Sequence, residues 1–351
     1  MPRFLDRDLE QLARDLFLAK GVRADEAAVV ASSLVESNLR GHDSHGVIRV
    51  VEYIEQLDTG QLVAGATMRV LAETPAMLAG DGGRGFGQVQ CRRLVEIVGR
   101  KGREQGVACG TLRNCGHIGR LGEWVEMAAR DGLGALISVN DNGVAFTVAP
   151  PGGIAPRIST NPLAIGVPTG GEPLVLDMST SAVANGKVKV ARLAGRQCPP
   201  GWIQDAGGNS TTDPHVMLAD PPGTLLPFGG DQGYKAFGLG LLLDILVGGL
   251  TGGFCPPAPT DVMECNNVLL VMWNPARFAG HDHFHREADK LIAAVRDTPR
   301  KLGVDHIQLP GDRSTETHRE RLANGIPLDG ENWETLARLA KQLGVELPVP
   351  R

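Results

Sequence analysis

The sequence predicts an α/β fold with a separate, mostly helical region at its N-terminus. Up to about residue 60 the apolar residues follow the 3.6-residue period of amphipathic helices. Farther along, short apolar strands alternate with helices, as in α/β domains. The length of 351 residues suits two domains. We therefore expect a helical region over residues 1–75 and a sheet domain over residues 76–309. Residues 310–351 are expected to pack against the helical region.

The composition is that of a soluble globular protein, with 21% charged and 42% hydrophobic residues. A net charge of -5 gives no basic footprint for nucleic acid, and 4% aromatic content argues against a platform for stacking bases. The N-terminus lacks the apolar stretch of a signal peptide. The most apolar stretch, 236–250, contains Asp244 and is expected to be too short for a bilayer. We expect a cytoplasmic protein with no membrane partner. Its six scattered cysteines predict free thiols.

Two amphipathic helices open the chain, the first ending near Gly21 and the second running from Asp25 to Leu39. The motif R-G-H-D-S-H-G follows. If Ser44 caps a third helix that ends near Leu57, one helical face is apolar. Its residues are Val47, Val50, Val51, Ile54 and Leu57.

The opposite face of this third helix carries the chemistry. His45, Arg49 and Tyr53 are spaced i, i+4 and i+8, so their side chains share one face beside Ser44. An arginine can hold a carboxylate with two hydrogen bonds while a histidine protonates the neighbouring oxygen. The pattern therefore suits a small substrate with a carboxylate next to a carbonyl. The alternative is a merely solvated polar face.

Gly80, Gly82 and Gly85 satisfy the dinucleotide-binding pattern G-x-G-x-x-G. A helix from about Gln88 to Arg103 follows, but the next strand, V-A-C-G-T-L-R, has no acidic residue at its end to bind a ribose. The sequence therefore argues against a Rossmann fold.

Two polar residues lie at predicted element ends in the middle of the chain. His117 is expected to open a helix, where the helix dipole favours its neutral, proton-accepting form; the alternative is a histidine that only caps backbone amides. Asp177 follows the strand Leu174–Leu176, where an Asp is either a turn-former or a functional group. Between the strands Leu133–Val139 and Leu163–Val167 lies a Pro- and Gly-rich loop of a kind that is often functional.

Downstream, Gly229 and Gly230 lead into a helix with Lys235 in its first turn, which is typical of a phosphate site. Close helix packing through Gly238 and Gly240 is the alternative. A strand over Asn267–Trp273 precedes the segment H-D-H-F-H. The histidines His281, His283 and His285 would converge on a metal only in an extended segment, and this gives the alternative function, a metal-dependent hydrolase or lyase. Near the C-terminus, Ser314 is expected to cap a helix, and a last helix covers Trp333–Leu343.

Five separated motifs carry a family resemblance. They are R-G-H-D-S-H-G-V-I-R followed by Tyr53, R-N-C-G-H-I-G-R-L-G, A-P-P-G-G with T-N-P, L-D-M-S-T-S, and the glycine-rich turn before Lys235; a P-G-D loop near the C-terminus also matches. In this order they resemble the malate/L-lactate dehydrogenase family, which is distinct from the Rossmann dehydrogenases.

The resemblance implies a non-Rossmann mixed-sheet domain that binds NAD or NADP, with a helical substrate and dimerisation layer. It also implies a homodimer whose active site lies near the subunit interface. The implied reaction moves a hydride between NAD(P)H and a 2-oxo acid or cyclic imino acid. Arg157 and Lys235 are candidates for a 2′-phosphate pocket.

The resemblance also implies roles for individual residues. His45, supported by Ser44, is the expected proton donor with Asp177 as its orienting partner, and His117 is the rival acid or base. Arg49 and Tyr53 are expected to bind the substrate. The expected cofactor-binding residues are Thr160, Asn161, Asp177, Met178, Ser179, Gly229, Gly230, Lys235, Gly311 and Asp312.

Overall fold

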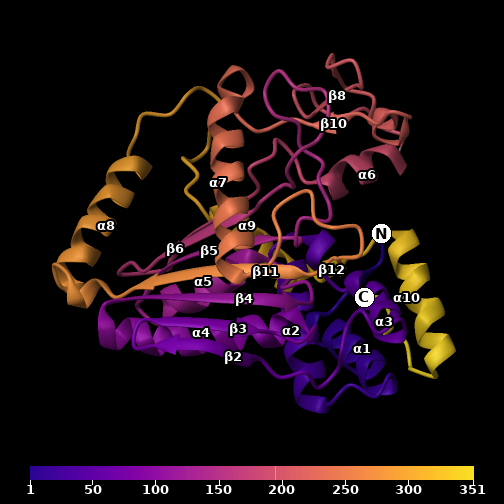
Figure 1. Ribbon diagram of the computed structural model, residues 1–351, viewed down its shortest axis with the longest axis horizontal. Helices are drawn as coiled ribbons and strands as arrows, with labels where there is room; N and C mark the ends of the chain where they lie inside the picture. Colours follow the sequence, from indigo (N-terminus) through magenta and orange to yellow (C-terminus); the bar gives the residue numbers. More distant parts are fainter. Residues whose placement is uncertain (194) are drawn as a thin grey trace.

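A seven-stranded mixed sheet forms the centre of the molecule (Figure 1). The computed structural model describes residues 1–193 and 195–351. Strands β3 and β4 run parallel, whereas every other neighbouring pair in this sheet is antiparallel. This arrangement confirms the predicted non-Rossmann α/β fold. In spatial order the strands are β2 (Arg69–Thr74), β3 (Met77–Asp81), β4 (Val107–Cys115), β11 (Asn266–Trp273), β5 (Gly134–Asn140), β6 (Leu163–Val167) and β7 (Leu174–Met178).

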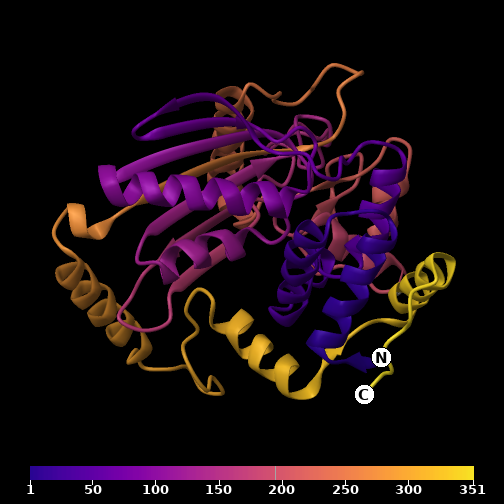
Figure 2. The same cartoon turned by 90° about the horizontal axis from the view of Figure 1, so that it is seen from below.

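Helices cover both faces of the sheet (Figure 1, Figure 2). Helices α4 (Gly87–Gln105) and α5 (Leu121–Arg130) lie on one face, where Leu94, Val98 and Trp124 are buried with the strand side chains. Helix α7 (Gly233–Thr251) lies on the other face. A smaller buried cluster joins α6 (Asn185–Leu193) to the short strands β8 (Ile203–Gln204) and β10 (Thr224–Leu225), and β9 (Ser210–Thr211) pairs with β8.

The N-terminal helices form a layer beside the sheet, and the C-terminus packs into it (Figure 2). Ile326 and Leu336 share one buried cluster with Leu9, Leu34 and Ile54. The predicted boundary at residue 75 falls between β2 and β3, which both belong to the sheet. The elements of this layer are α1 (Asp6–Ala19), α2 (Ala24–Leu39), α3 (Arg49–Asp58), α9 (Asp312–Asn324), α10 (Gly330–Leu343) and the pair β1 (Arg3–Phe4) with β12 (Ile326–Pro327).

The predicted cap at Ser44 was wrong. Residues 43–45 form a 3-10 turn and α3 begins only at Arg49. The Val47 N–H bonds to Asn38 Oδ1 at 2.8 Å, so an amide of the preceding helix takes the place of a Ser44 cap. A Cβ at Gly46 would lie 2.2 Å from the same Asn38 oxygen, which explains the glycine. The predicted apolar face of this helix is confirmed, since Val47, Val50 and Ile54 are buried.

Two other predicted helix starts are displaced. His117 lies in the loop after β4, four residues before α5 begins at Leu121. Helix α9 begins at Asp312 after Gly311, whose positive φ of 95° ends the preceding loop. Ser314 therefore lies inside the first turn and donates its hydroxyl to the Gly311 carbonyl at 2.9 Å.

The G-x-G-x-x-G turn joins β3 to α4 and closes on a carboxylate of the chain itself. Asp81 accepts hydrogen bonds from the Gly83 N–H at 3.0 Å, Arg113 Nε at 3.0 Å and Asn114 Nδ2 at 3.2 Å. These donors would otherwise be available to a phosphate. The turn is therefore not a dinucleotide site, as the sequence predicted.

Helix α7 is longer than predicted. Within the 22-residue segment Gly230–Thr251, an 18-residue window has a mean hydropathy of 1.4. By length and composition this helix is able to cross a membrane, so the prediction that the stretch is too short was wrong. Its inner side packs on the sheet, and Asp244 accepts hydrogen bonds there from Asn140 and Asn161, both at 2.9 Å. The sheet-facing side of α7 is therefore part of the protein core.

Candidate active site

The predicted site residues meet at one end of the sheet. Strand β4 ends at Cys115, which pairs with Asn266 at the start of β11, and β5 ends at Asn140, which pairs with Asn267. The end of β7, Met178, pairs with Leu163 of β6. The loops that carry His117 and Thr160 therefore lie at the same edge as the end of β7, which carries Asp177. The turn with His45 approaches it from the helical layer.

His45 and His117 lie against each other at this edge. Their rings are nearly parallel, with centroids 5.2 Å apart and an angle of 28° between the planes. Tyr53 is buried, which argues against the alternative of a merely solvated polar face, and its hydroxyl lies 2.7 Å from Nδ1 of His117. Gln88 Nε2 donates to the same hydroxyl at 2.9 Å. The structure thus brings His45, His117 and Tyr53 together.

The hydrogen bonds of His117 fix its tautomer. The Gly119 backbone N–H donates to Nδ1 at 3.3 Å, and a backbone N–H is only a donor. Nδ1 is therefore assigned as the acceptor of the Gly119 N–H, the Tyr53 hydroxyl shares the single lone pair of this nitrogen, and the ring proton is assigned to Nε2. Burial, followed by the charge of Arg49, holds the pKa of His117 well below its usual range. The cause is burial and not the helix terminus that the sequence suggested.

His45 is oriented by its neighbour Ser44, as predicted. The Ser44 hydroxyl lies 3.0 Å from His45 Nδ1, and Arg49 Nε donates to the Ser44 carbonyl at 2.8 Å. Burial and then the Arg49 charge lower the pKa of His45 to about 4. Arg49 is half-buried and also pairs with Glu52.

Asp177 lies near His45 without bonding to it in the described part of the chain. Its Oδ2 accepts the Gly122 N–H at the start of α5 at 2.7 Å, so Asp177 does not orient His45 through a direct hydrogen bond. Its charge still acts on His45 and raises the pKa of that imidazole. Burial raises the pKa of Asp177 itself.

Arg120 is a site residue that the sequence reasoning missed. Its side chain is 2% exposed, and it pairs with Glu126 at 3.3 Å. A Cβ on Gly122 would lie 2.3 Å from Arg120 Nη1 and 2.9 Å from Asp177 Oδ2, so both groups approach the space above that glycine. The available signal was an arginine at an otherwise apolar helix start, three residues after His117.

Three of the predicted cofactor segments lie next to one another. The Thr180 N–H bonds to the Thr160 carbonyl at 2.9 Å, and the Phe228 N–H bonds to the Thr180 carbonyl at 3.2 Å. These bonds join the loops that carry Asn161, Ser179 and Gly229. The fourth predicted cofactor segment carries Gly311 and Asp312. It lies against β7, because a Cβ on Gly311 would lie 3.4 Å from the Val175 carbonyl.

Several predicted cofactor side chains are already engaged. Asn161 is buried and donates to the Gly240 carbonyl and to Asp244 Oδ2, both at 2.9 Å. Asp312 pairs with Arg296 at 3.0 Å and accepts the Leu309 N–H at 2.8 Å. Ser179 donates to the Ser181 carbonyl at 3.2 Å. These side chains hold the loops in place, and Met178 completes the β6–β7 pairing.

The glycine turn before α7 fits an anionic group. Gly229 and Gly230 have positive φ values of 101° and 56°, and a Cβ on Gly230 would have no neighbour within 4 Å. The turn leads into the N-terminus of α7, whose free backbone N–H groups favour an anion, and Lys235 is exposed in its first turn. The residues present therefore fit a nicotinamide dinucleotide.

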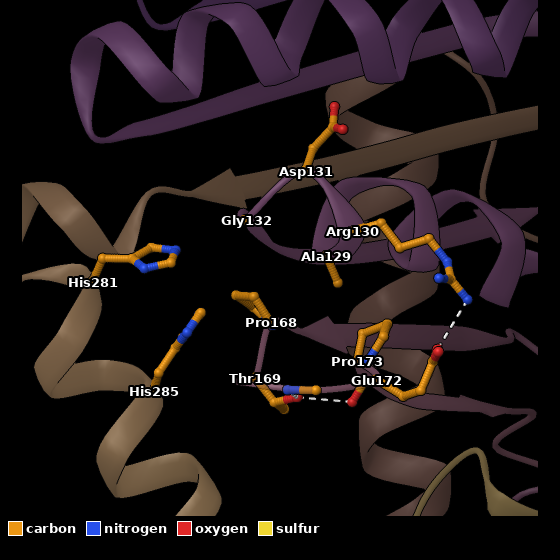
Figure 3. Close-up of a pocket in the computed structure, with 11 residues that line it drawn as sticks. Ala129, Arg130, Asp131, Gly132, Pro168, Thr169, Glu172, Pro173, His281 and His285 are labelled. Carbon is orange, nitrogen blue, oxygen red and sulfur yellow. Dashed lines mark hydrogen bonds and ion pairs between the residues drawn. The ribbon is translucent and has the colours of Figure 1, made fainter.

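The histidines of α8 (His281–Arg296) lie elsewhere (Figure 3). His281 and His285 have ring centroids 3.9 Å apart and line a cavity of about 440 Å³. The cavity also touches Gly132 before β5 and Pro173 before β7, so it lies at the opposite end of the sheet from His45. His283 is not among its lining residues. In residues 1–193 and 195–351 no set of three or more His, Cys, Asp or Glu is placed to hold a metal ion.

Comparison with known proteins agrees with this geometry. The family model for malate/L-lactate dehydrogenase matches residues 6–337. An L-lactate dehydrogenase of Cupriavidus necator is 36% identical over 342 residues, which cover 96% of this chain and 97% of that protein. A Δ1-pyrroline-2-carboxylate/Δ1-piperideine-2-carboxylate reductase of Pseudomonas syringae pv. tomato is 33% identical over 95% of this chain and 94% of its own.

The fold is shared with a solved structure of this kind. A malate/lactate dehydrogenase from E. coli superimposes with a TM-score of 0.90 and 33% identity, covering 98% of this chain and 96% of that one. None of these comparisons supports a metal-dependent hydrolase. The chain therefore belongs to the malate/L-lactate dehydrogenase family and is an oxidoreductase that transfers a hydride between a nicotinamide cofactor and a 2-oxo acid or cyclic imino acid.

Proposed function

We propose that His45 is the proton donor and acceptor of this reaction and that Arg49 holds the substrate carboxylate. The observation that carries this assignment is the fixed tautomer of His117, whose Nδ1 accepts the Gly119 N–H. Protonating that nitrogen would break the bond to Gly119, so His117 is a poor acid or base. His45 has no such restraint, because the Ser44 hydroxyl both donates and accepts.

His117 then acts as a neutral hydrogen-bond donor. Its Nε2–H, on the side of the ring away from Tyr53, is available to polarise the substrate carbonyl oxygen. Tyr53 stays protonated because burial raises its pKa above its usual range. Tyr53 thus positions His117 and does not need to touch the substrate, a revision of its predicted role.

Substrate binding itself prepares His45 as an acid. Arg49 is a main cause of the low pKa of His45, after burial. A carboxylate bound to Arg49 neutralises that charge and raises the pKa of His45, which then gains the proton that the developing alkoxide or amine requires. When bound, the reduced nicotinamide supplies the hydride to the carbonyl or imine carbon. In the reverse direction neutral His45 removes the hydroxyl proton.

The cofactor phosphates are assigned to the N-terminus of α7, with Gly229, Gly230 and Lys235, and the nicotinamide end to the loops of Thr160 and Asp177. The hydrogen bonds between these loops support this placement. NAD and NADP both remain candidates, since Arg157 and Lys235 are exposed cations that suit a 2′-phosphate.

A homodimer formed through the outer side of α7 completes the proposal. Leu242, Ile245 and Leu250 are 60%, 51% and 57% exposed on this helix, although its inner side is packed on the sheet. Such a row of large apolar residues marks an interface. A second copy of the chain is the proposed partner of this face, in place of a membrane, and the protein is proposed to be cytoplasmic.

We also propose that the helical layer and the sheet are two separate domains.

A spectrophotometric assay tests the proposed function. NADH and NADPH are each tried with pyruvate, oxaloacetate, 2-oxoglutarate, 2,3-diketogulonate and piperideine-2-carboxylate. Oxidation of one nucleotide by any of these compounds supports the proposal and identifies both cofactor and substrate class. If the whole panel is inert and neither nucleotide shifts the melting temperature, the proposed cofactor site is wrong.

A further inference from the structure

We propose that His281 and His285 form a binding site for a divalent transition-metal ion of the zinc, cobalt and nickel class, with two imidazole ligands from the protein and water as the remaining ligands. The site lies at the end of the sheet opposite His45, so it is separate from the proposed reaction and its cofactor. It gives a role to the segment H-D-H-F-H, which hydride transfer does not use.

The helical conformation brings two of the three histidines together. Residues 281–296 form α8, and side chains four positions apart on a helix lie one above the other. The His281 and His285 rings accordingly have centroids 3.9 Å apart, whereas His283 does not line the cavity. This spacing of four is the one by which a helix presents two histidines to zinc. An extended segment is therefore required for three converging histidines but not for this pair.

The pair opens on a cavity with room for an ion and its water ligands. The cavity has a volume of about 440 Å³, and both rings project from α8 towards Gly132 and Pro168 (Figure 3). Nε2 of His285 is buried and has no hydrogen-bond partner within residues 1–193 and 195–351. A buried polar atom without a partner costs free energy. With the ring proton on Nδ1, this nitrogen offers its lone pair to a metal ion.

The other polar groups around the cavity favour a cation over an anion. Arg130 pairs with Glu126 at 2.9 Å and with Glu172 at 3.1 Å, so its charge is already matched. The Gly171 N–H bonds to the Thr169 hydroxyl at 3.1 Å. These donors are therefore engaged within the protein. Imidazole nitrogens suit zinc, copper and nickel, whereas magnesium and calcium prefer oxygen ligands.

A carboxylate on the same helix holds the histidine pair over the cavity. Asp289 lies one turn beyond His285 and accepts the Gly170 N–H at 3.1 Å, which fixes α8 to the turn between β6 and β7. No residue of α8 is buried, so this helix has little other packing to hold it. An ion bound to residues 281 and 285 would clamp the first turn of α8. Because the ion binds the folded helix, it should stabilise the folded protein.

The test titrates metal-free, full-length protein with CoCl2 and with NiCl2, and uses MgCl2 as the oxygen-preferring comparison. Calorimetry gives the number of ions per chain and the Kd. The absorbance of bound cobalt distinguishes imidazole from thiolate ligands, which matters because the described chain has six free cysteines. His281→Ala/His285→Ala removes both ligands from a helix without buried residues, so folding is not at risk. The matched control is His283→Ala, at an exposed residue of the same turn.

We expect the double variant to bind one cobalt or nickel ion fewer per chain than wild type, and His283→Ala to keep the wild-type count and Kd. At an ion concentration about 100-fold above Kd, the Tm of wild type should rise by about 3 °C or more, and that of the double variant should not. Hydride-transfer rates of both variants should match wild type. An equal ion count in wild type and double variant would overturn the proposal. An equal loss in His283→Ala, a thiolate spectrum at this site, or an equal effect of magnesium would also overturn it.

Discussion

The hydroxyl of Tyr53 lies 2.7 Å from Nδ1 of His117 and ties the helical layer to the active-site loop of the sheet. The phenol accepts from Gln88, donates to His117, and so keeps the His117 proton on Nε2. The active site thus depends on a contact between two packing layers and not on one helix face.

Replacing Tyr53 by Phe should therefore lower kcat by about 10- to 100-fold, a range typical of lost positioning of a catalytic group. The ring stays buried, so stability should fall by only about 1 kcal/mol. Steady-state kinetics and thermal melts measure both. Thr59→Val, which removes an exposed hydroxyl at the end of α3, is the control and should change neither. Full activity in Tyr53→Phe would show that the Tyr53 hydroxyl is not required to keep the proton of His117 on Nε2.

In the pH–rate profile of hydroxy-acid oxidation, the acid limb should reflect the ionisation of His45. For kcat/KM this limb reflects the free enzyme, where the pKa of His45 is about 4. Arg49→Met removes a lowering charge and should move the limb upward toward the ordinary histidine value. Asp177→Asn removes a raising charge and should move it downward. Rate profiles from about pH 3 to pH 8 decide this, and shifts in the reverse directions would exclude His45 as the base.

Arg49→Met should chiefly raise the apparent KM for the 2-oxo acid, by about 10- to 100-fold, because a charge-assisted pair with the carboxylate is lost. Lys189→Met, an exposed cation on α6, serves as the control. An unchanged KM in the arginine variant would remove Arg49 from the substrate site.

Glu123 should make the enzyme less stable at alkaline pH. Burial raises its pKa from 4.5 to about 7, against a 2.6 Å hydrogen bond from Ser33. The folded state thus holds the proton more tightly than the unfolded state. This contribution is complete below pH 4.5 and is lost as pH rises through 7. Glu123→Gln should gain about 3 kcal/mol over wild type at pH 8 and almost nothing near pH 4.5. Denaturant melts of this variant and of the exposed control Glu104→Gln measure the free energy of unfolding at both pH values. An equal gain in stability for Glu123→Gln at both pH values would show that the effect does not come from the titration of Glu123.

The outer side of α7 should hold the dimer together. Leu242→Asp/Ile245→Asp places two charges in the proposed interface and should give a monomer in sedimentation velocity experiments. Leu291→Asp, at a residue that is 66% exposed on α8, should leave the dimer intact. A monomeric wild type, or a double variant that still dimerises, would show that α7 does not form this interface.

Local patterns predicted the elements and the cluster around His45, but not the contacts that give the site its chemistry. The strands and helices follow from apolar periodicity, and Ser44 and His45 are sequence neighbours. Tyr53 meets His117 across 64 residues of chain, a distance at which periodicity carries no information. The cap at Ser44 failed for the same reason, because Asn38 of the preceding helix binds the Val47 N–H. Arg120 was missed because its burial and its closeness to Asp177 of β7 arise from packing between elements.

The most direct test of the central claim compares His45→Gln with His117→Gln in full-length enzyme, using the 2-oxo acid that wild type reduces best. Nucleotide fluorescence gives cofactor affinity, and rapid-mixing absorbance at the nicotinamide band gives the rate of hydride transfer in one turnover. We predict that His45→Gln abolishes turnover while nucleotide Kd changes by less than about threefold, and that His117→Gln keeps a slow but measurable rate. Sustained turnover in His45→Gln together with none in His117→Gln would contradict the assignment and make His117 the proton donor.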